Sequence, residues 1–460
     1  MTEICDLVIK NGYCISFDSK LRLVTKRTSI YISNNKISHI GELKGEYRAS
    51  KADVKIEASG KIVIPGLVNL HMHSGPVAIR GLAEGLPLFP WLQTYVDPAH
   101  RVLTEKDAYA DYMLSYVEMV KSGITSVLDM YRFGYRGVEA AEKVGIRTTI
   151  APYVSDLPEY SFLEKPSDNY RLLKEKNGSA NGRVRIWIGL EHIVYCSEEA
   201  FVKAREYADK YKVGIHTHGE ESKQMRKQIK IKYGLYPIQL FGRYGILKRG
   251  TVLAHCVWLN ETEMNLLSKT NTSVAHCPTS NMKLASGIAP IIELLDKGVN
   301  VGLGTDGVKE NNRLDMFQEM KISSLLQKVR HLNASIMTPE QVFFMATLGG
   351  ARALMLERET GTIEIGKKAD LVIVDYRRPH LTPVIERNRG NILANLVFSA
   401  QPSDVNTVIV DGSVIVRNSK VMTVNEQEII SLANKRAMEL LERVDFRDVS
   451  SKKTECHGFS

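Results

Sequence analysis

Two histidines and two glutamates lie close together in the segment VGIHTHGEESK, residues 213–223. If this segment is a strand, His216 and His218 point to the same face, because side chains alternate along a strand. Two imidazoles on one face can chelate a metal ion, whereas most buried histidines only bond a partner in the core. Glu220 and Glu221 could transfer protons. The segment alone leaves the metal site and the ordinary core histidine open.

The same pattern recurs elsewhere, since histidines and one aspartate end several short apolar segments, among them GLVNLHMH, GLEH, TVLAHC and VNVGLGTDG. Three imidazoles and a carboxylate make a suitable set for Zn²⁺, with a position left open for water. The residues at these segment ends are His71, His73, His192, His218, His255 and Asp306.

Eight short apolar segments, each followed by a connecting and mostly helical stretch, fill the middle of the chain. This alternation predicts an α/β fold, a (β/α)8 TIM-like barrel of parallel strands. In such a barrel the catalytic residues come from the C-terminal ends of different strands, which is where the histidines fall. We place the barrel at residues 63–356.

Both ends of the chain are rich in β-branched segments separated by turn residues, for example DLVIKNGYCISF and VNTVIVDGSVIVRNSKV. Residues 1–62 and 357–424 are therefore expected to form one small β-sandwich domain, because chain termini commonly lie near each other. Residues 425–460 are expected to form a C-terminal helix and tail.

Composition favours an ordinary globular protein of 460 residues, with 44% hydrophobic and 25% charged residues. The net charge is +9, but the basic residues are scattered and accompany no nucleic-acid-binding motif. No signal peptide and no run of about 18 apolar residues is visible, so we expect no membrane span. The six cysteines form no CxxC pair, which suits a reducing cytoplasm.

Several segments resemble the amidohydrolase superfamily: VIPGLVNLHMHS, IHTHGEE, VLAHCVWL, VAHCPTSNMKLASGIAPI, VGLGTDGVKENNRLDMFQEMK and GTIEIGKKADLVIVD. They are similar to the branch of S-adenosylhomocysteine and 5′-methylthioadenosine deaminases, triazine hydrolases, and guanine and cytosine deaminases. The resemblance implies the barrel, a β-sandwich from both termini and one divalent metal ion per chain, usually zinc and less often iron. The implied ligands are His71, His73, His218 and Asp306.

The resemblance also implies roles for other residues. Glu221 matches the acid of an HxxE motif and would protonate the substrate ring, while Asp306 would accept the proton of the attacking water. His255 would orient that water or the leaving group. His216 and Glu220 match no assigned role, so we expect His216 to pack inside the barrel below the metal and Glu220 to be solvated or paired.

The substrate side of the pocket is implied by weaker matches. Trp91, in LPLFPWLQTYVDP, resembles a loop that covers the pocket, and His192 matches a position that contacts the purine or sugar. Binuclear members carry a lysine at the end of the fourth strand, where GLEHIVYC offers His192 instead, so we expect one metal ion. Glu310 stands in VKENN, where adenosine-type relatives have AASNN, and we expect it to contact the substrate.

These matches predict hydrolytic deamination of an amino-substituted heterocycle, an aminopurine nucleoside or base of the adenosine or 5′-methylthioadenosine type, with release of ammonia. TIAPYVSD contains no arginine for a homocysteine carboxylate, which weighs against S-adenosylhomocysteine. The alternatives are a triazine-type hydrolase that expels chloride or an alkylamine, a guanine, cytosine or pterin deaminase, and a non-catalytic barrel. As partners we expect a small heterocyclic substrate and further copies of the chain, in a dimer or higher homo-oligomer.

Overall fold

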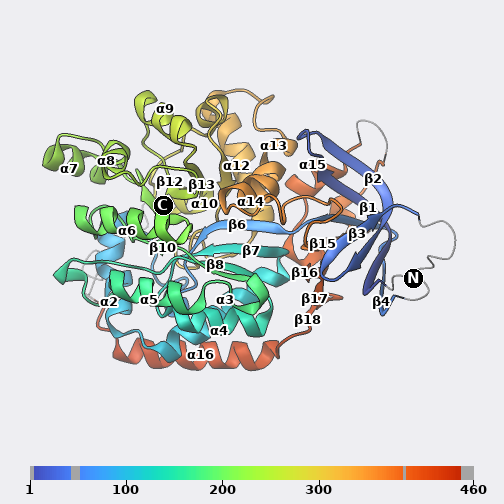
Figure 1. The fold of residues 1–460 in the computed structure, drawn as a ribbon, viewed down its shortest axis with the longest axis horizontal. Helices are drawn as coiled ribbons and strands as arrows, with labels where there is room; N and C mark the ends of the chain where they lie inside the picture. Colours follow the sequence, from blue (N-terminus) through green and yellow to red (C-terminus); the bar gives the residue numbers. More distant parts are fainter. Residues whose placement is uncertain (1–4, 43–51, 387–389, 447–460) are drawn as a thin grey trace, which may run out of the picture.

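A barrel of parallel strands lies at the centre of the computed structural model, which describes residues 5–42, 52–386 and 390–446 (Figure 1). The strands pair in the orders β6-β7-β8-β9 and β10-β11-β12-β13-β14, and β9 and β10 are two parts of one strand interrupted at Trp187. The circle closes where the Asp306 N–H donates to the His71 carbonyl (3.0 Å). The eight-stranded TIM-like barrel is thus present among the described residues. The strands are β6 (Leu67–Met72), β7 (Ile124–Asp129), β8 (Arg147–Ile150), β9 (Val184–Ile186), β10 (Ile188–Gly189), β11 (Ile215–Gly219), β12 (Thr251–His255), β13 (Ser273–His276) and β14 (Val301–Leu303).

Helices follow the strands and cover the outside of the barrel (Figure 1). The main covering helices are α3 (Glu105–Lys121), α4 (Gly134–Val144), α5 (Pro166–Lys176), α6 (Glu198–Tyr211), α8 (Pro237–Tyr244), α9 (Glu261–Thr270), α11 (Ile291–Asp296) and α12 (Met316–His331). The others are α1 (Leu88–Trp91), α2 (Asp97–Val102), α7 (Lys223–Tyr233), α10 (Pro278–Lys283), α13 (Pro339–Phe344), α14 (Gly350–Ala353), α15 (Ile392–Phe398) and α16 (Glu426–Arg443).

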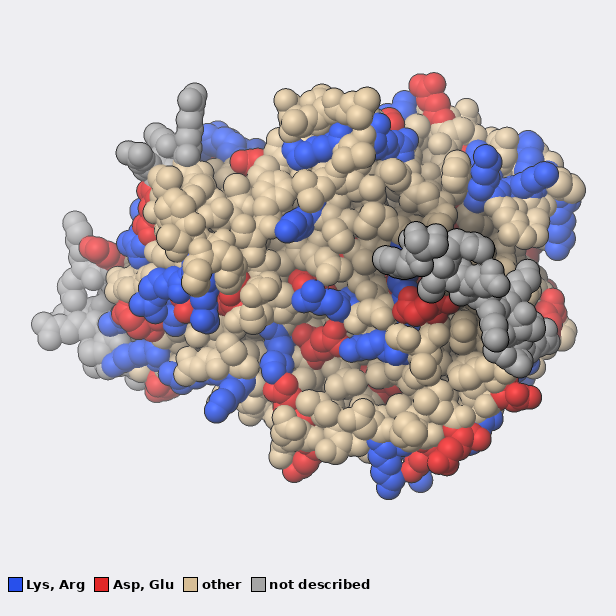
Figure 2. Space-filling model, turned by 180° about the vertical axis from the view of Figure 1, so that it is seen from behind, with Lys and Arg blue, Asp and Glu red and all other residues tan. Residues whose placement is uncertain are grey.

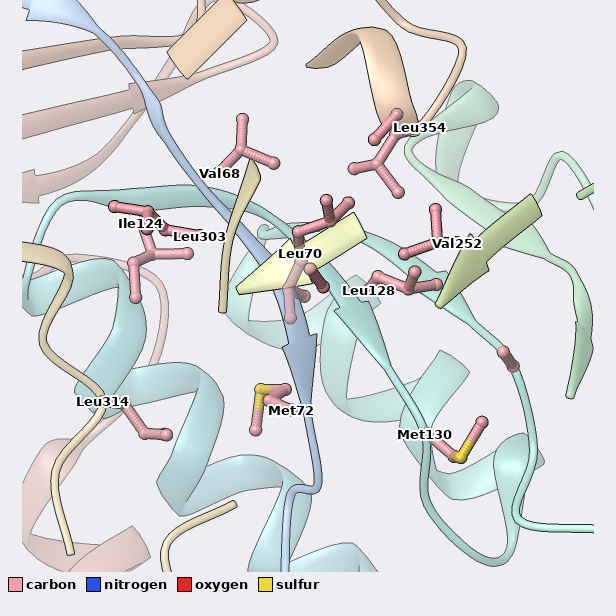
Figure 3. Close-up of a cluster of buried hydrophobic side chains, with 14 of the residues drawn as sticks. Val68, Leu70, Met72, Ile124, Leu128, Met130, Val252, Leu303, Leu314 and Leu354 are labelled. Atoms are coloured by element: carbon pink, nitrogen blue, oxygen red, sulfur yellow. The ribbon is translucent and has the colours of Figure 1, made fainter. Parts of the chain in front are cut away.

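Strand β6 shows how the barrel separates its apolar core from its polar site. Val68, Leu70 and Met72 are buried among apolar side chains of neighbouring strands and loops (Figure 3). Val68 packs so closely on α14 that a Cβ at Gly350 would come within 2.7 Å of it. The alternation along the strand turns His71 to the opposite face, toward the inside of the barrel.

Strands from both ends of the chain form one nine-stranded sheet beside the barrel (Figure 1). The two ends meet where β5 pairs antiparallel with β15, with Pro65 opposite Leu371. A division into two sheets, which a sandwich requires, is not found among the described residues. The strands are β1 (Leu7–Phe17), β2 (Leu23–Ser33), β3 (Lys36–Ile40), β4 (Val54–Glu57), β5 (Lys61–Pro65), β15 (Leu371–Asp375), β16 (Val405–Val410), β17 (Ser413–Arg417) and β18 (Lys420–Val421).

A buried ion pair joins this sheet to the barrel. Arg147, the first residue of β8, donates to both carboxylate oxygens of Asp370 (2.7 and 3.0 Å), and its guanidinium lies 3.5 Å from Asp411. All three side chains are buried. Both aspartates belong to the C-terminal part of the chain, beside strands of the nine-stranded sheet. This contact therefore fixes that sheet against the start of a barrel strand.

The C-terminal helix expected from the sequence is α16, which begins after the capping residue Asn425 and lies along α3 (Figure 1). Arg436 and Arg443 of this helix both donate to the buried carboxylate of Asp107 (2.6 and 2.5 Å). The expected tail falls on residues 447–460, which lie outside the described residues.

The surface shows basic and acidic side chains interspersed on the face seen in Figure 2, in line with the scattered charges of the sequence. In the part of the chain that the structure describes, no helix is long and apolar enough to cross a membrane. The described cysteines, Cys5, Cys14, Cys196, Cys256 and Cys277, are all free thiols. Cys456 lies outside the described residues.

Candidate active site

Four side chains, carried at the ends of three different barrel strands, converge at the C-terminal end of the barrel. His71 lies near the end of β6 and His73 directly follows it, His218 lies near the end of β11, and Asp306 follows β14. The Nε2 atoms of His73 and His218 are 3.3 Å apart, and Asp306 Oδ1 lies 3.4 Å from Nε2 of both His71 and His73. All four side chains are buried. The residues proposed as metal ligands therefore face one another.

The outer nitrogens of two of these histidines are held by backbone carbonyl groups. His73 Nδ1 is 2.6 Å from the carbonyl oxygen of Met130, and His218 Nδ1 bonds to that of Glu191. A carbonyl oxygen can only accept, so each Nδ1 carries the proton and donates. The Nε2 atoms then present unprotonated lone pairs, and these two lone pairs point toward each other.

His71 is held in the same tautomer, with the proton on Nδ1, by His216, a residue to which the sequence assigned no role. His216 Nδ1 is 2.9 Å from the Val252 carbonyl and must donate to it, so its Nε2 is left as an acceptor. His71 Nδ1, 2.8 Å away, donates to that Nε2. His71 Nε2, buried and without a hydrogen-bond partner among the described residues, turns its lone pair to Asp306. His216 packs inside the barrel, as expected, and fixes the tautomer of His71.

This donor set fits a divalent cation. Three imidazole lone pairs and a carboxylate repel one another at these distances unless a positive charge lies between them. The carboxylate is itself oriented, because Ser280 Oγ donates to Asp306 Oδ2 (2.6 Å) and the Gly307 N–H donates to Oδ1 (2.8 Å). Burial raises the pKa of Asp306, but hydrogen bonding and charge from the histidines outweigh it and leave this pKa well below its ordinary value.

The backbone is strained where the site residues leave the strands. Glu220, His255, Cys256 and Asp306 all have positive φ, at 49°, 69°, 50° and 62°. Non-glycine residues rarely adopt this conformation, which costs on the order of 1–2 kcal/mol per residue. The surrounding structure must hold them there, as when the Val257 and Trp258 N–H groups donate to the Glu220 carbonyl (3.0 and 3.1 Å).

Glu221 and His255 lie beside the metal-type cluster. Glu221 Oε2 is 3.8 Å from His255 Nε2, and that nitrogen is also 3.8 Å from Asp306 Oδ2. Asn281 Oδ1 accepts from His255 Nδ1 (2.9 Å), which leaves Nε2 facing the two carboxylates. Burial raises the pKa of Glu221 and His255 opposes this, so the carboxyl group keeps its proton to a higher pH than an exposed glutamate.

A cavity opens onto this cluster, and nearly every sequence-predicted site residue lines it. Trp91 is buried in its wall, with Nε1 donating to the Ala83 carbonyl (3.0 Å). His192 Nδ1 accepts from the Val194 N–H (3.1 Å), while its Nε2 has no partner among the described residues. The predicted residues in the lining are His73, Trp91, His192, His218, Glu221, His255, Asp306 and Glu310, and His71 lies just behind them.

Two residues at the cavity, Glu191 in its lining and Lys309 beside Glu310, were missed from the sequence. Glu191 lines the cavity next to His192, with Oε1 accepting from Tyr153 (3.0 Å) and Oε2 unpartnered among the described residues. Lys309 is buried and pairs with Glu310 at 2.6 Å. The only sequence signal for these residues was their position next to His192 and Glu310.

Glu220 was expected to be either solvated or paired, and in the structure it is paired. It is buried, and its Oε1 lies 2.5 Å from Arg226 Nη1, which also bonds Glu263 (2.8 Å). Glu220 thus belongs to a cluster behind the strand, and Glu221 alone of the two glutamates lines the cavity.

Comparison with known proteins places this arrangement among related chains. Residues 62–415 match the Amidohydrolase family. A 5′-deoxyadenosine deaminase of Methanosarcina mazei is 38% identical over 443 residues, 96% of this chain and 100% of that protein. A 5-methylthioadenosine/S-adenosylhomocysteine deaminase of Pyrococcus furiosus is 39% identical over 425 residues, 92% of this chain and 98% of that protein.

Solved structures show the same fold. An adenosine deaminase from Xanthomonas campestris with bound zinc has a TM-score of 0.89 and 26% identity, covering 96% of this chain and all of that one. An atrazine chlorohydrolase from Arthrobacter aurescens, complexed with zinc, has a TM-score of 0.86 at 22% identity, covering 94% of this chain and all of that one. The latter likeness concerns the fold alone.

Proposed function

Because the chain belongs to the amidohydrolase family, we propose that it hydrolytically deaminates an adenosine-type compound. Water replaces the exocyclic amine of the ring: the C–N bond breaks, a C–O bond forms, and ammonia leaves. The curated relatives named above are deaminases of 5′-deoxyadenosine and of 5-methylthioadenosine or S-adenosylhomocysteine, and they align over almost the whole chain. The buried cluster and the two acid–base candidates beside it suit this reaction.

His71, His73, His218 and Asp306 would hold one divalent metal ion, and zinc is the ion we propose. Three imidazoles and one carboxylate match the ligands that zinc takes in catalytic sites. A divalent ion in this position supplies Lewis acidity and makes a water molecule nucleophilic near neutral pH. The hydrogen bonds that the outer nitrogens donate to Met130, Glu191 and His216 would keep each imidazole turned toward the ion.

Proton transfers fall to the carboxyl groups. Glu221, whose pKa burial raises, would carry a proton to the ring nitrogen as the neighbouring carbon is attacked. Asp306, ionised over a wide pH range, would accept the proton of the attacking water and pass it to the departing amine. His255 lies 3.8 Å from both carboxylates and would orient the water between them.

The wall of the cavity would bind a flat ring. Trp91 offers an aromatic surface, and His192 Nε2 offers a free polar atom for a ring or sugar edge. Among the described residues that line the cavity there is no lysine or arginine. We therefore propose a neutral adenosine-type nucleoside, such as 5′-deoxyadenosine, as a better substrate than S-adenosylhomocysteine, whose carboxylate would lack a cationic partner.

The observation that carries this proposal is the set of unprotonated imidazole nitrogens around Asp306, with the protonated-carboxyl candidate Glu221 beside it. The test incubates the zinc-loaded protein with 5′-deoxyadenosine, adenosine, 5′-methylthioadenosine, S-adenosylhomocysteine, guanine, cytosine and a chlorotriazine. Ammonia and chloride are followed separately. We expect ammonia from the adenine nucleosides; chloride release without ammonia from any amino-substituted ring would sink the deaminase proposal.

A further inference from the structure

Glu310 has a buried carboxylate oxygen that no described residue satisfies. The residue is 4% exposed and lines the cavity. Its Oε1 pairs with Lys309 Nζ (2.6 Å), whereas Oε2 has no hydrogen-bond partner among the described residues. Buried acceptors without a partner are rare and costly, so this oxygen is suited to a donor on a bound molecule.

The oxygen is held at a defined place beside the reaction centre. It lies over Gly307, where an added Cβ would approach Glu310 Oε2 to 2.3 Å, so only glycine leaves room for it. One ligand atom each of Glu310, His73 and Asp306 lie within 4.8 Å of one another. Glu310 is thus on the His73 side of Asp306.

Glu221 occupies the other side, next to His255. A ring carbon that meets the attacking water near Asp306 therefore has one carboxyl group on either flank. Glu221 is placed for the ring nitrogen. The second group that changes its bonding at this carbon is the leaving amine. Glu191 and Glu310 both line the cavity with an unpartnered carboxylate oxygen, but Glu310 is the one that has an atom within 4.8 Å of ligand atoms of His73 and Asp306.

Resting on the deamination proposed above, we propose that Glu310 accepts a hydrogen bond from the leaving amine and so selects an amine over a halide as leaving group. The amine gains a proton before its C–N bond breaks and carries positive charge at that moment, which a carboxylate stabilises. The proton comes from the attacking water by way of Asp306, so Glu310 gains and loses none. A departing chloride has no N–H to donate, so the unpartnered Oε2 of Glu310 would not stabilise its departure.

The experiment compares two substrates that differ only in the leaving group, adenosine and 6-chloropurine riboside. In Glu310→Ala we expect kcat for adenosine to fall about 10- to 100-fold, the size of one charge-assisted hydrogen bond. The chloropurine rate should fall far less or rise, so the ratio of the two rates drops at least about tenfold. Glu310→Gln, which keeps a neutral acceptor, should lie between the two proteins.

Glu319→Gln is the matched control, because Glu319 is also a buried carboxyl group but does not line the cavity. It should leave the ratio of the two rates as it is. If Glu310→Ala does not fold because Lys309 loses its partner, Lys309→Met combined with Glu310→Ala removes both charges and is assayed in the same way. Thermal unfolding and metal content are measured for each variant.

An equal fall for both substrates, or a loss of bound metal in the Glu310 variants, overturns this inference and leaves the deaminase proposal standing. Absence of ammonia from any adenine nucleoside with the parent protein overturns the proposed function, and this inference with it. A drop in the ratio of the adenosine rate to the chloropurine rate, with retained metal, supports the inference, since a purely structural defect would slow both reactions alike; a rise in this ratio overturns it.

Discussion

Two buried clusters of charge lie at opposite ends of the barrel strands and are neutralised in different ways. At the start of β8, Arg147 meets the carboxylates of Asp370 and Asp411, so the positive charge comes from the chain itself. Beyond the end of β14, Asp306 faces imidazole lone pairs and has no lysine or arginine within ion-pair distance among the described residues. In the first cluster the charges of the chain itself balance, and the ion pairs join two parts of the fold. The second cluster has a charge and donor set complementary to a bound cation.

A third arrangement shows what happens to a buried carboxyl group with neither partner. Asp111 is buried and accepts hydrogen bonds from Tyr131 (2.6 Å) and the Val77 N–H (3.1 Å). Burial raises the pKa of Asp111 to about 7, so below that pH its charge is removed by a proton and not offset by a cation. An arginine, the proposed metal ion and a proton thus offset the cost of burying a carboxylate in three different ways.

The largest effect should follow from removing a ligand of the open cluster. His73→Ala should lose bound metal and measurable activity together, because one missing imidazole breaks the chelate. Elemental analysis and an ammonia assay on the same sample check this. His276→Gln, also a buried histidine at a strand end, is the control and should retain the metal. A His73 variant that keeps one metal ion per chain would contradict the ligand assignment.

Glu221→Gln should keep the metal and lower kcat by about 10²–10⁴, the contribution of a general acid–base. Glu220→Gln should keep most of the activity, since Glu220 is bonded to Arg226 away from the cavity. Steady-state kinetics and metal content distinguish the two variants. Interchanged behaviour would show that the neighbouring glutamate is the acid.

Arg147→Met should lower the free energy of unfolding by about 3–5 kcal/mol, because it leaves the buried carboxylate of Asp370 without its cation, whereas Asp411 keeps Lys368 at 3.1 Å. The activity of the folded molecules should be retained, since Arg147 is at the other end of the strands from the cavity. Denaturant unfolding and kcat of the folded fraction are the measurements. Combining Arg147→Met with Asp370→Asn should recover part of the lost free energy of unfolding. A loss of bound metal from Arg147→Met would contradict the view that the two charge clusters are independent.

His216→Ala should weaken metal affinity about 10- to 100-fold without removing a direct ligand, because His71 loses the acceptor that fixes its tautomer. Competition with a chelator measures this affinity. His216→Gln, which can still offer an acceptor oxygen to His71 Nδ1, should be closer to the parent protein. Equal affinities in all three proteins would mean that His71 needs no such support.

A pH-dependent effect concerns the carboxyl group of Asp111, which keeps its proton to a raised pH. The pKa of Asp111 in the folded chain is about 7, above its ordinary value, so between about pH 4 and pH 7 the folded state binds more protons than the unfolded state. Its stabilising contribution is therefore complete below about pH 4 and is lost as the pH rises through 7. Asp111→Asn should flatten the fall in unfolding free energy over this range. An unchanged slope in denaturant unfolding would show that Asp111 is ionised in the folded chain.

The parts of the site that the sequence predicted are those set by strand periodicity. The spacing of His71 and His73 puts both on one face, and the strand ends of a parallel barrel meet at one edge, so convergence with His218 and Asp306 followed without a structure. The contact between His216 and His71 depends on how two separate strands stand side by side, which spacing within one segment cannot reveal.

Other features depend on breaks in regular structure. Glu191 follows an interruption at Trp187 that separates β9 from β10, so alternation along the segment did not indicate where its side chain points. Lys309 and Glu310 lie in a turn after Asp306, where no period applies. The β-rich ends of the chain were also recognisable from the sequence. Their hydrogen bonding in one sheet, in place of the expected sandwich, depends on the pairing between β5 and β15, and neither segment encodes this pairing alone.

That pairing sets an order for folding during synthesis. β5 leaves the ribosome long before β15, so the edge of β5 opposite β1 remains unpaired while the whole barrel is translated. An unpaired edge of buried, β-branched residues such as Ile62, Val63 and Ile64 is a template for pairing with another nascent chain. The barrel can begin to form first, but the amino-terminal strands become safe from aggregation only when the last quarter of the protein has emerged.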